Sequence, residues 1–184
     1  MANKINTRAI IKQFLASDEQ VLVLPFDGLR DDVSRHWHSF LGSSKWDLFR
    51  KAFVLALARN LSSGRLKNFL LRSIGVKIGK NVFIASTVAL DIQFPELITI
   101  EDGVIIGMNA HIATHEVTHT HIRLGKVRIG KNALIGGQST IRSGITIGEN
   151  AVVAMRAFAT ESVPAHTMVT GLPERKVVPL NHPL

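Results

Sequence analysis

A six-residue period begins at Ile78 and restricts what the chain can fold into more than any other feature. Eleven of the twelve residues at its first position are Ile, Leu or Val, the set being Ile78, Ile84, Leu90, Ile100, Ile106, Ile112, Ile129, Ile135, Ile141, Ile147, Val153 and Ala159. The fifth position of each unit is mostly small or β-branched. Neither a helix, which repeats about every 3.6 residues, nor an alternating strand generates this pattern alone. The period therefore predicts short parallel strands joined by tight corners, which point one large and one small residue into a narrow prism.

The second position of the unit is often glycine, at residues 79, 107, 130, 136 and 148. We interpret these glycines as corner residues that need a positive φ. An aliphatic residue, then Gly, then four others resembles the hexapeptide-repeat motif, which marks the left-handed parallel β-helix. The predicted fold class is therefore mainly β, a left-handed parallel β-helix of about four coils with an α-helical N-terminal region. Its handedness comes from the resemblance, because parallel crossovers are otherwise right-handed.

The period slips twice, between Leu90 and Ile100 and between Ile112 and Ile129. In the family that the motif resembles, three units make one coil, so the aliphatic positions stack as three ladders. The predicted ladders are Ile78/Ile100/Ile129/Ile147, Ile84/Ile106/Ile135/Val153 and Leu90/Ile112/Ile141/Ala159. Both slips follow a residue of the third ladder, so we expect loops 93–99 and 113–128 to leave the prism from one edge on adjacent layers. Long loops on a rigid scaffold often carry function.

The chain is expected to have three parts. Residues 1–77 form a largely helical N-terminal region, residues 78–164 the β-helix with its loop 113–128, and residues 165–184 a C-terminal tail. Hydrophobic residues make up 46% and charged residues 20%, which predicts a sizeable core, and the absence of cysteine excludes disulfide and thiolate sites. No apolar run approaches the roughly 18 residues that span a bilayer. The first residues lack the apolar stretch of a signal peptide, so a cytoplasmic location is expected.

Positive charge is concentrated in residues 45–77, which hold eight basic side chains against Asp47 in a chain of net charge +8. The segment is also apolar with helical spacing, at Leu66, Phe69, Leu70 and Ile74. Ser62-Ser63-Gly64 predicts a break between two helices. Two interpretations stay open: a solvated basic face on helices packed against the main domain, or a face for peripheral contact with the inner membrane surface or an acidic partner. No nucleic-acid-binding motif accompanies the charge, so nucleic acid is not an expected partner.

Four of the eight histidines fall in residues 111–121, at His111, His115, His119 and His121. In one interpretation, a histidine is the general base that deprotonates an acceptor as it attacks a thioester. In a second, the histidines and Glu116 bind zinc, as in the γ-class carbonic anhydrases built on the same prism, although those draw ligands from different coils and subunits. In a third, they are polar loop residues of a β-helix that binds or scaffolds without catalysis.

The motifs around this loop resemble one group of enzymes. They are Thr114-His115, Gly125-x-Val127-x-Ile129-Gly130-x-Asn132, Ile135-Gly136-Gly137, Gly144-Ile145-Thr146-Ile147-Gly148-x-Asn150-Ala151-Val152, Val163-Pro164 and Gly171-x-Pro173. Together they look like the maltose, galactoside and capsular-polysaccharide O-acetyltransferases, over roughly residues 75–178. The resemblance implies a homotrimer in which acetyl-CoA lies in a groove between neighbouring β-helices. It also implies that the loop histidine, here His115, deprotonates the acceptor.

The resemblance further implies residues that contact the cofactor. Gly137, Met155 and Thr160 match positions that line the pantetheine channel, and Arg175 and Lys176 match a basic tail that reaches the nucleotide phosphates. Asp91 lies on the loop edge below His115 in the ladder arrangement, and it is a candidate both for binding acceptor hydroxyls and for capping a turn.

Two positions depart from the family's pattern. Met155-Arg156 stands where the family usually has Ala-Gly, so Arg156 either adds a phosphate contact or narrows the channel. Leu134 stands where a bulky aromatic is often found, which predicts that no ring packs on the base. We expect an acetyl-CoA-dependent acyltransferase that acts on a small-molecule or glycan acceptor, at a saccharide-type hydroxyl or an amine, and that needs no metal.

Overall fold

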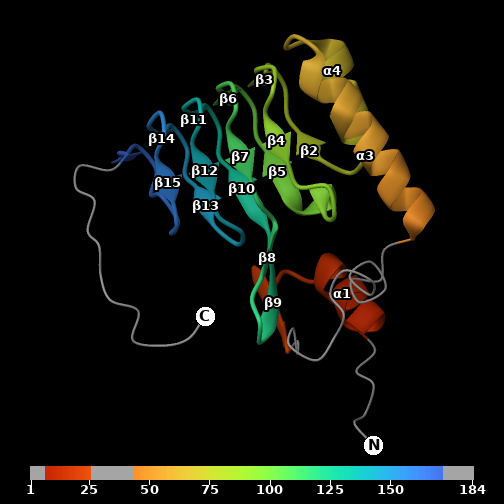
Figure 1. Cartoon of the computed structure of the whole chain (residues 1–184). Coiled ribbons are helices and arrows are strands. Elements are labelled where there is room, and N and C mark those ends of the chain that lie inside the picture. Colours follow the sequence, from red (N-terminus) through yellow and green to blue (C-terminus); the bar gives the residue numbers. More distant parts are fainter. Residues whose placement is uncertain (1–6, 26–43, 172–184) are drawn as a thin grey trace, which may run out of the picture.

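The computed structural model describes residues 7–25 and 44–171. Figure 1 shows a column of short strands with two helices along one end and a small separate sheet at its side. The described helices are α1 (Thr7–Ala16), α3 (Lys45–Asn60), α4 (Arg65–Ser73) and the 3-10 turn η1 (Pro95–Leu97). The strands of the column are β2 (Lys77–Ile78), β3 (Phe83–Ile84), β4 (Ala89–Leu90), β5 (Ile98–Ile100), β6 (Ile105–Ile106), β7 (His111–Ile112), β10 (Val127–Ile129), β11 (Leu134–Ile135), β12 (Thr140–Ile141), β13 (Thr146–Ile147), β14 (Val152–Val153), β15 (Phe158–Ala159) and β16 (Met168–Val169).

The column is built from three parallel sheets that the chain visits in turn. Their strand orders are β2-β5-β10-β13 in the first sheet, β3-β6-β11-β14-β16 in the second and β4-β7-β12-β15 in the third. Ile100 pairs with Ile78 below it and Ile129 above it, and the same stacking holds along the other predicted ladders. The three predicted ladders are therefore confirmed. The chain visits the three sheets in turn and adds one strand to each sheet in every layer, which is the architecture of a parallel β-helix.

Two corners of the column hold residues that the sequence marks as candidates for a functional site. We call the corner between the third and first sheets the loop edge; it comprises residues 91–97, 113–126, 142–145 and 160–162. We call the corner between the second and third sheets the short-turn edge; it comprises residues 85–88, 107–110, 136–139 and 154–157. Both interruptions of the period lie on the loop edge, on adjacent layers, as the sequence predicted.

The glycines of the repeat have a different role from the one expected. Among the described glycines, φ lies in the left-handed region at Gly75, Gly103 and Gly144 and at none of the second-position glycines. The close approach of the next layer requires glycine at the second position of the repeat. A Cβ on Gly136, for example, would lie 2.4 Å from the backbone N of Met155. The left-handed corner residues are instead mostly polar: Asn81, Thr87, Asn109, Asn132, Gln138, Asn150, Arg156 and His166. Asparagine adopts this conformation more readily than most residues do.

The segment 113–128, expected as a loop, contains a β-hairpin. Its strands are β8 (His115–Val117) and β9 (His121–Gly125), and β9 also pairs antiparallel with β1 (Val21–Pro25). Ile122 and Leu124 alternate with half-buried residues and pack in a second small core with Phe14 of α1 and Phe94. The N-terminal residues thus complete the hairpin from a distant part of the sequence.

The helices α3 and α4 cover the end of the β-helix where β2 and β3 lie (Figure 1). The predicted break between them is present, since α3 ends at Asn60 and α4 begins at Arg65. On α4, Leu70 and Ile74 pack against the main core as the spacing predicts. Leu66 and Phe69, however, are more than half exposed, while Lys67 and Asn68 are buried.

The reason lies in the first turn of the β-helix, whose backbone carbonyls have no further layer to pair with. Asn68 Nδ2 donates to the carbonyl of Val82 at 3.0 Å and Lys67 Nζ donates to that of Ala85 at 2.6 Å. Arg72 donates to the carbonyls of Ile78 and Gly79. A buried carbonyl without a donor costs free energy, so the polar side chains of the helix turn inward.

Candidate active site

The candidate site is built where the two long excursions leave the loop edge. β4 ends at Leu90 and Asp91 follows it, while β7 ends at Ile112 and is followed by Thr114 and His115. Leu90 and Ile112 are paired in the third sheet. The same register that builds the core therefore places Asp91 directly beside the start of the hairpin.

His115 and Asp91 form a close pair. The ring nitrogen Nδ1 of His115 lies 2.6 Å from Oδ2 of Asp91. The Asp91 side chain is 3% exposed and that of His115 is 23% exposed, so the imidazole lies between the buried carboxylate and the solvent.

Backbone amides complete the surroundings of Asp91. Oδ2 also accepts from the backbone N of Thr114 and of His115, at 2.9 and 3.2 Å. Oδ1 accepts from the backbone N of Gln93 at 2.8 Å and more weakly from that of Phe94. These protein donors occupy the lone pairs of the carboxylate that were expected to bind acceptor hydroxyls.

The electrostatics of the pair fix which ring nitrogen carries the proton. Burial by itself raises the pKa of Asp91, but the hydrogen bond and charge of His115 and the amides of Thr114 and Gln93 lower it to about 2. An ionised carboxylate can only accept a hydrogen bond. Nδ1–H of His115 is therefore the donor, and Nε2 is the nitrogen that can take up a proton in the neutral ring.

An aromatic ring does pack against His115, contrary to the prediction made from Leu134. Phe94, from the loop that carries Asp91, meets the imidazole edge-on with ring centroids 6.4 Å apart. Phe94 is 3% exposed and belongs to the second small core. No position of the aligned motifs indicates this contact, because Phe94 comes from the excursion one layer away.

Glu116 anchors the base of the hairpin to the next layer. Its carboxylate accepts from Arg142 Nη2 at 2.9 Å and from the hydroxyl of Ser143 at 2.6 Å, both at the loop edge. Burial raises the pKa of Glu116, while Arg142, Ser143 and Arg123 together lower it below its usual range. This network fixes the strand that carries His115.

The other histidines of the segment do not join this arrangement. The Nδ1 atom of His121 lies within 3.1 Å of the hydroxyls of Thr118 and Thr120, and His119 is exposed. Within residues 7–25 and 44–171, no three His, Asp or Glu side chains are grouped so as to hold a metal ion. The ligands that the zinc interpretation requires are thus not brought together here.

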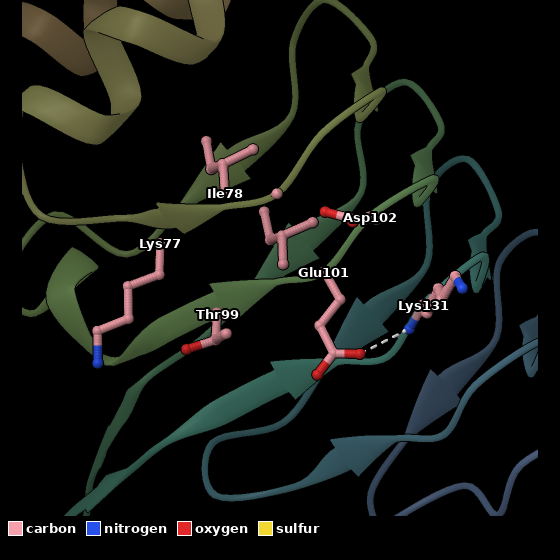
Figure 2. Close-up of a pocket in the computed structure, with 8 residues that line it drawn as sticks. Lys77, Ile78, Thr99, Glu101, Asp102 and Lys131 are labelled. Atoms are coloured by element: carbon pink, nitrogen blue, oxygen red, sulfur yellow. Dashed lines mark hydrogen bonds between the residues drawn. The ribbon is translucent and has the colours of Figure 1, made fainter.

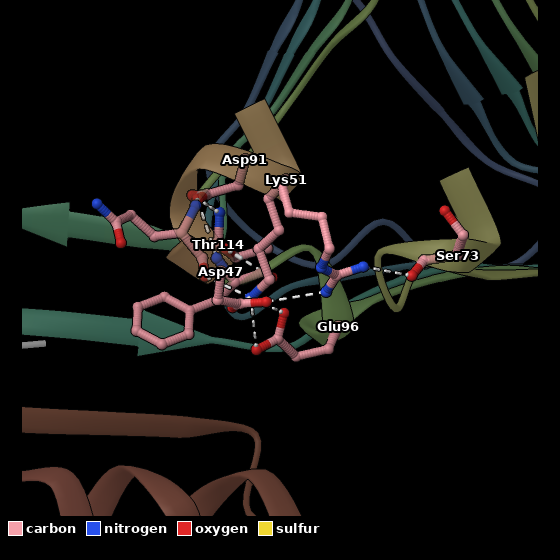
Figure 3. A network of polar contacts seen from close by, with 9 residues as sticks. Asp47, Lys51, Ser73, Asp91, Glu96 and Thr114 are labelled. Atoms are coloured by element: carbon pink, nitrogen blue, oxygen red, sulfur yellow. Dashed lines mark hydrogen bonds and ion pairs between the residues drawn. The ribbon is translucent and has the colours of Figure 1, made fainter. Parts of the chain in front are cut away.

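A polar network connects the Asp91 loop to the helices, as Figure 3 shows. Lys51 of α3 is 7% exposed and donates to the carbonyl of Gln93 at 3.2 Å and to Glu96 at 3.0 Å. Lys51 also pairs with Asp47, which accepts from Arg50. The loop that holds Asp91 is therefore tied to α3.

The residues expected to contact the cofactor fall on two different edges. Thr160 follows β15 on the loop edge, which it shares with His115. Gly137 and Met155 lie on the short-turn edge, and Met155 is 69% exposed. The third sheet separates the two edges within one chain. Arg175 and Lys176 lie outside the described residues.

Arg156 occupies a left-handed corner, with φ 60°, where the family usually has glycine. Its Nε donates to the side-chain oxygen of Gln138 at 2.6 Å, and its backbone N donates to the carbonyl of Gly137. The guanidinium is thus held along the short-turn edge beside the expected channel residues.

A separate hollow of about 450 Å³ lies over the first sheet (Figure 2). Glu101 in this hollow accepts from Arg128 and from the backbone N of Lys131, and Asp102 accepts from the backbone N of Lys80. The hollow contains no histidine, and its carboxylates are already engaged, so the loop edge is the stronger candidate for chemistry.

Comparison with known proteins agrees with the geometry. A family model described as the hexapeptide repeat of succinyl-transferase matches residues 126–155. A Bacillus subtilis (strain 168) protein named "Putative acetyltransferase YvoF" is 35% identical over 140 residues, which are 76% of this chain and 81% of that protein. The galactoside O-acetyltransferase of Escherichia coli (strain K12) is 29% identical over 113 residues, covering 58% of this chain and 55% of that protein.

The fold is shared with a solved structure. The hexapeptide-repeat-containing acetyltransferase VCA0836 of Vibrio cholerae O1 biovar eltor, solved in complex with acetyl coenzyme A, superposes with a TM-score of 0.58 at 19% identity. The match covers 82% of this chain and 92% of that one.

The pairing of Asp91 makes a prediction about stability and pH. Its pKa is about 2 in the folded chain against an ordinary value of 3.8, so the unfolded state binds the proton more readily. The ionised Asp91 therefore contributes about 2 kcal/mol to the free energy of unfolding above about pH 4, and this contribution is lost as the pH falls towards 2. Asp91→Asn should remove this part of the loss, as measured by denaturant unfolding at successive pH values. An unchanged loss in Asp91→Asn would contradict the pairing.

Proposed function

Because the chain belongs to the family of hexapeptide-repeat acetyltransferases, we propose that it transfers the acetyl group of acetyl-CoA to a saccharide-type hydroxyl, or an amine, with His115 as the general base. The observation that carries the proposal is the bond between Nδ1 of His115 and the buried, ionised Asp91. The galactoside acceptor of the Escherichia coli relative supports the saccharide class. A left-handed sense for the helix, with four coils, belongs to the same proposal.

The reaction follows from the protonation state of the Asp91–His115 pair. Nε2 of His115 takes the proton of the acceptor hydroxyl as its oxygen attacks the thioester carbonyl carbon. The tetrahedral intermediate then collapses, the carbon–sulfur bond breaks, and the leaving CoA sulfur receives the proton from Nε2–H. Asp91 stabilises the imidazolium that exists between these two transfers. It acts as a positioning residue because its oxygens bind the imidazole and backbone amides.

Binding of the acetyl donor, acetyl-CoA, requires a second copy of the chain. Within one chain, Gly137 and Met155 lie on the short-turn edge, and His115 lies on the loop edge across the third sheet. A homotrimer would place the short-turn edge of one copy against the loop edge of the next, so that each groove uses residues of two copies. The acetyl-CoA bound by the Vibrio cholerae relative supports this donor.

The base is tested by replacing it. His115→Ala should lower the rate of CoA release on an array of sugar acceptors by about 10²–10⁴-fold. His119→Ala is the matched control, since it removes an exposed histidine of the same hairpin, and it should retain the wild-type rate. Equal rates in His115→Ala and the wild type would remove His115 from the mechanism.

The shared groove is tested by mixing two defective chains. Met155→Trp adds bulk at an exposed position of the short-turn edge, so it should fold and lose acetyl-CoA binding. Random co-assembly with His115→Ala in equal amounts should restore about a quarter of the wild-type activity, because one groove in four then combines two intact edges. The shared groove would be contradicted if verified mixed trimers recovered no activity. It would also be contradicted if sedimentation showed the fully active wild type to be a monomer.

A further inference from the structure

The two helices at the end of the column expose an unusual amount of apolar surface. Six large apolar side chains of α3 and α4 are between 47% and 74% exposed: Trp46, Phe49, Phe53, Leu57, Leu66 and Phe69. Trp46 and Phe49 stack on each other with ring centroids 5.8 Å apart. Contiguous apolar surface of this kind usually marks an interaction site.

These side chains form one outward face on each helix. On α3 they follow the spacing i, i+3, i+7 and i+11, opposite the buried Lys51 and Ala58. On α4, Leu66 and Phe69 lie opposite Lys67 and Leu71, which face the β-helix. We call this surface the outer helical face. On α4 the apolar side chains face outward because Lys67 and Asn68 face inward and donate to carbonyls of the first turn of the β-helix.

Basic side chains surround the apolar ones. The exposed cations of the segment are Lys45, Arg50, Arg59, Arg65, Arg72 and Lys77. Asp47 is the one acidic residue in 45–77, and it is already paired with Arg50 and Lys51. Arg50 is paired with Asp47, and residues 45–77 contain no other acidic side chain to balance the remaining cations. The segment that forms the outer helical face therefore combines large apolar side chains with net positive charge.

We propose that the outer helical face docks on a lipid bilayer that carries anionic head groups. Aromatic and leucine side chains can enter the acyl boundary while arginine and lysine pair with the phosphates above it, which is the arrangement of an interfacial helix. No described helix is long and apolar enough to cross a membrane, so the contact is one of helices lying on the surface.

The charge distinguishes this occupant from two others. A second copy of the same face would bring like charges together, because a two-fold interface places the same patch on both sides. Nucleic acid would pair with the cations but offers no apolar layer for Phe49, Phe53 and Phe69. A lipid surface offers both.

Docking leaves the candidate active site accessible. Lys51, which ties α3 to the Asp91 loop, points to the side of the helix away from the outer helical face. The inference does not depend on acetyl transfer, and its test measures binding alone.

The test is flotation of the full chain with vesicles at low salt. Vesicles of phosphatidylglycerol and phosphatidylethanolamine are compared with vesicles of phosphatidylcholine alone. The wild type should float with the anionic vesicles, lose binding at high salt, and remain unbound with the neutral ones. The triple change Trp46→Ser, Phe49→Ser, Phe53→Ser should reduce partitioning at least about tenfold, since it removes the aromatic anchors.

Two further variants keep the test decisive. Phe158→Ser removes an equally exposed aromatic from the far end of the column and should float like the wild type. Arg59→Glu with Arg65→Glu leaves the aromatic stripe intact and should weaken binding by about 30-fold or more. Circular dichroism verifies that each variant is folded.

Three results would overturn the proposal. The first is a wild type that does not float with anionic vesicles at low salt. The second is a triple-serine variant and an Arg59→Glu/Arg65→Glu variant that both float as well as the wild type. The third is sedimentation in which the triple-serine variant forms a smaller assembly, which would assign the outer helical face to contact between copies.

Discussion

The stacking register of the three parallel sheets is the constraint on which the rest of the structure depends. Each ladder isoleucine above the first layer lies over an aliphatic residue of the layer below, and a slip of one residue would turn the whole set outward. This register fixes where each corner lies as well as what fills the core. Because Leu90 pairs with Ile112, the two excursions that follow them leave from one edge, and Asp91 meets His115 without any special contact to bring them together.

Contacts from three elements hold Asp91 and His115 in place. Phe94 packs on the imidazole from the small core, Glu116 ties the hairpin to Arg142 on the next layer, and Lys51 holds the Asp91 loop to α3. Each partner belongs to a different element. The β-helix supplies the position of His115, while the N-terminal residues contribute to the packing around it.

The sequence predicted the ladders and the loop edge because a six-residue period is a local signal with one physical solution. It did not predict the pairing of β1 with β9, which joins residues about a hundred positions apart, although the alternation of Ile122 and Leu124 with polar residues could have indicated a strand. On α4 it placed Leu70 and Ile74 correctly but not Leu66 and Phe69. The apolar spacing contains no information about the open carbonyls to which Lys67 and Asn68 donate. The glycines of the repeat do lie at corners, but the reason predicted for them is wrong. Gly136 is required because the backbone of the next layer leaves no room for a Cβ, and its φ is not in the left-handed region.

We propose that the buried carboxylate of Asp91 holds the proton of His115 on Nδ1, so that Nε2 acts as the base. Nitrogen-15 NMR of histidine-labelled protein measures this tautomer directly at a pH where the imidazole is neutral, with His115→Ala used to assign the signal. We expect a protonated Nδ1 and an unprotonated Nε2 in the wild type, with this preference weakened in Asp91→Asn. A neutral His115 that carries its proton on Nε2 would contradict it.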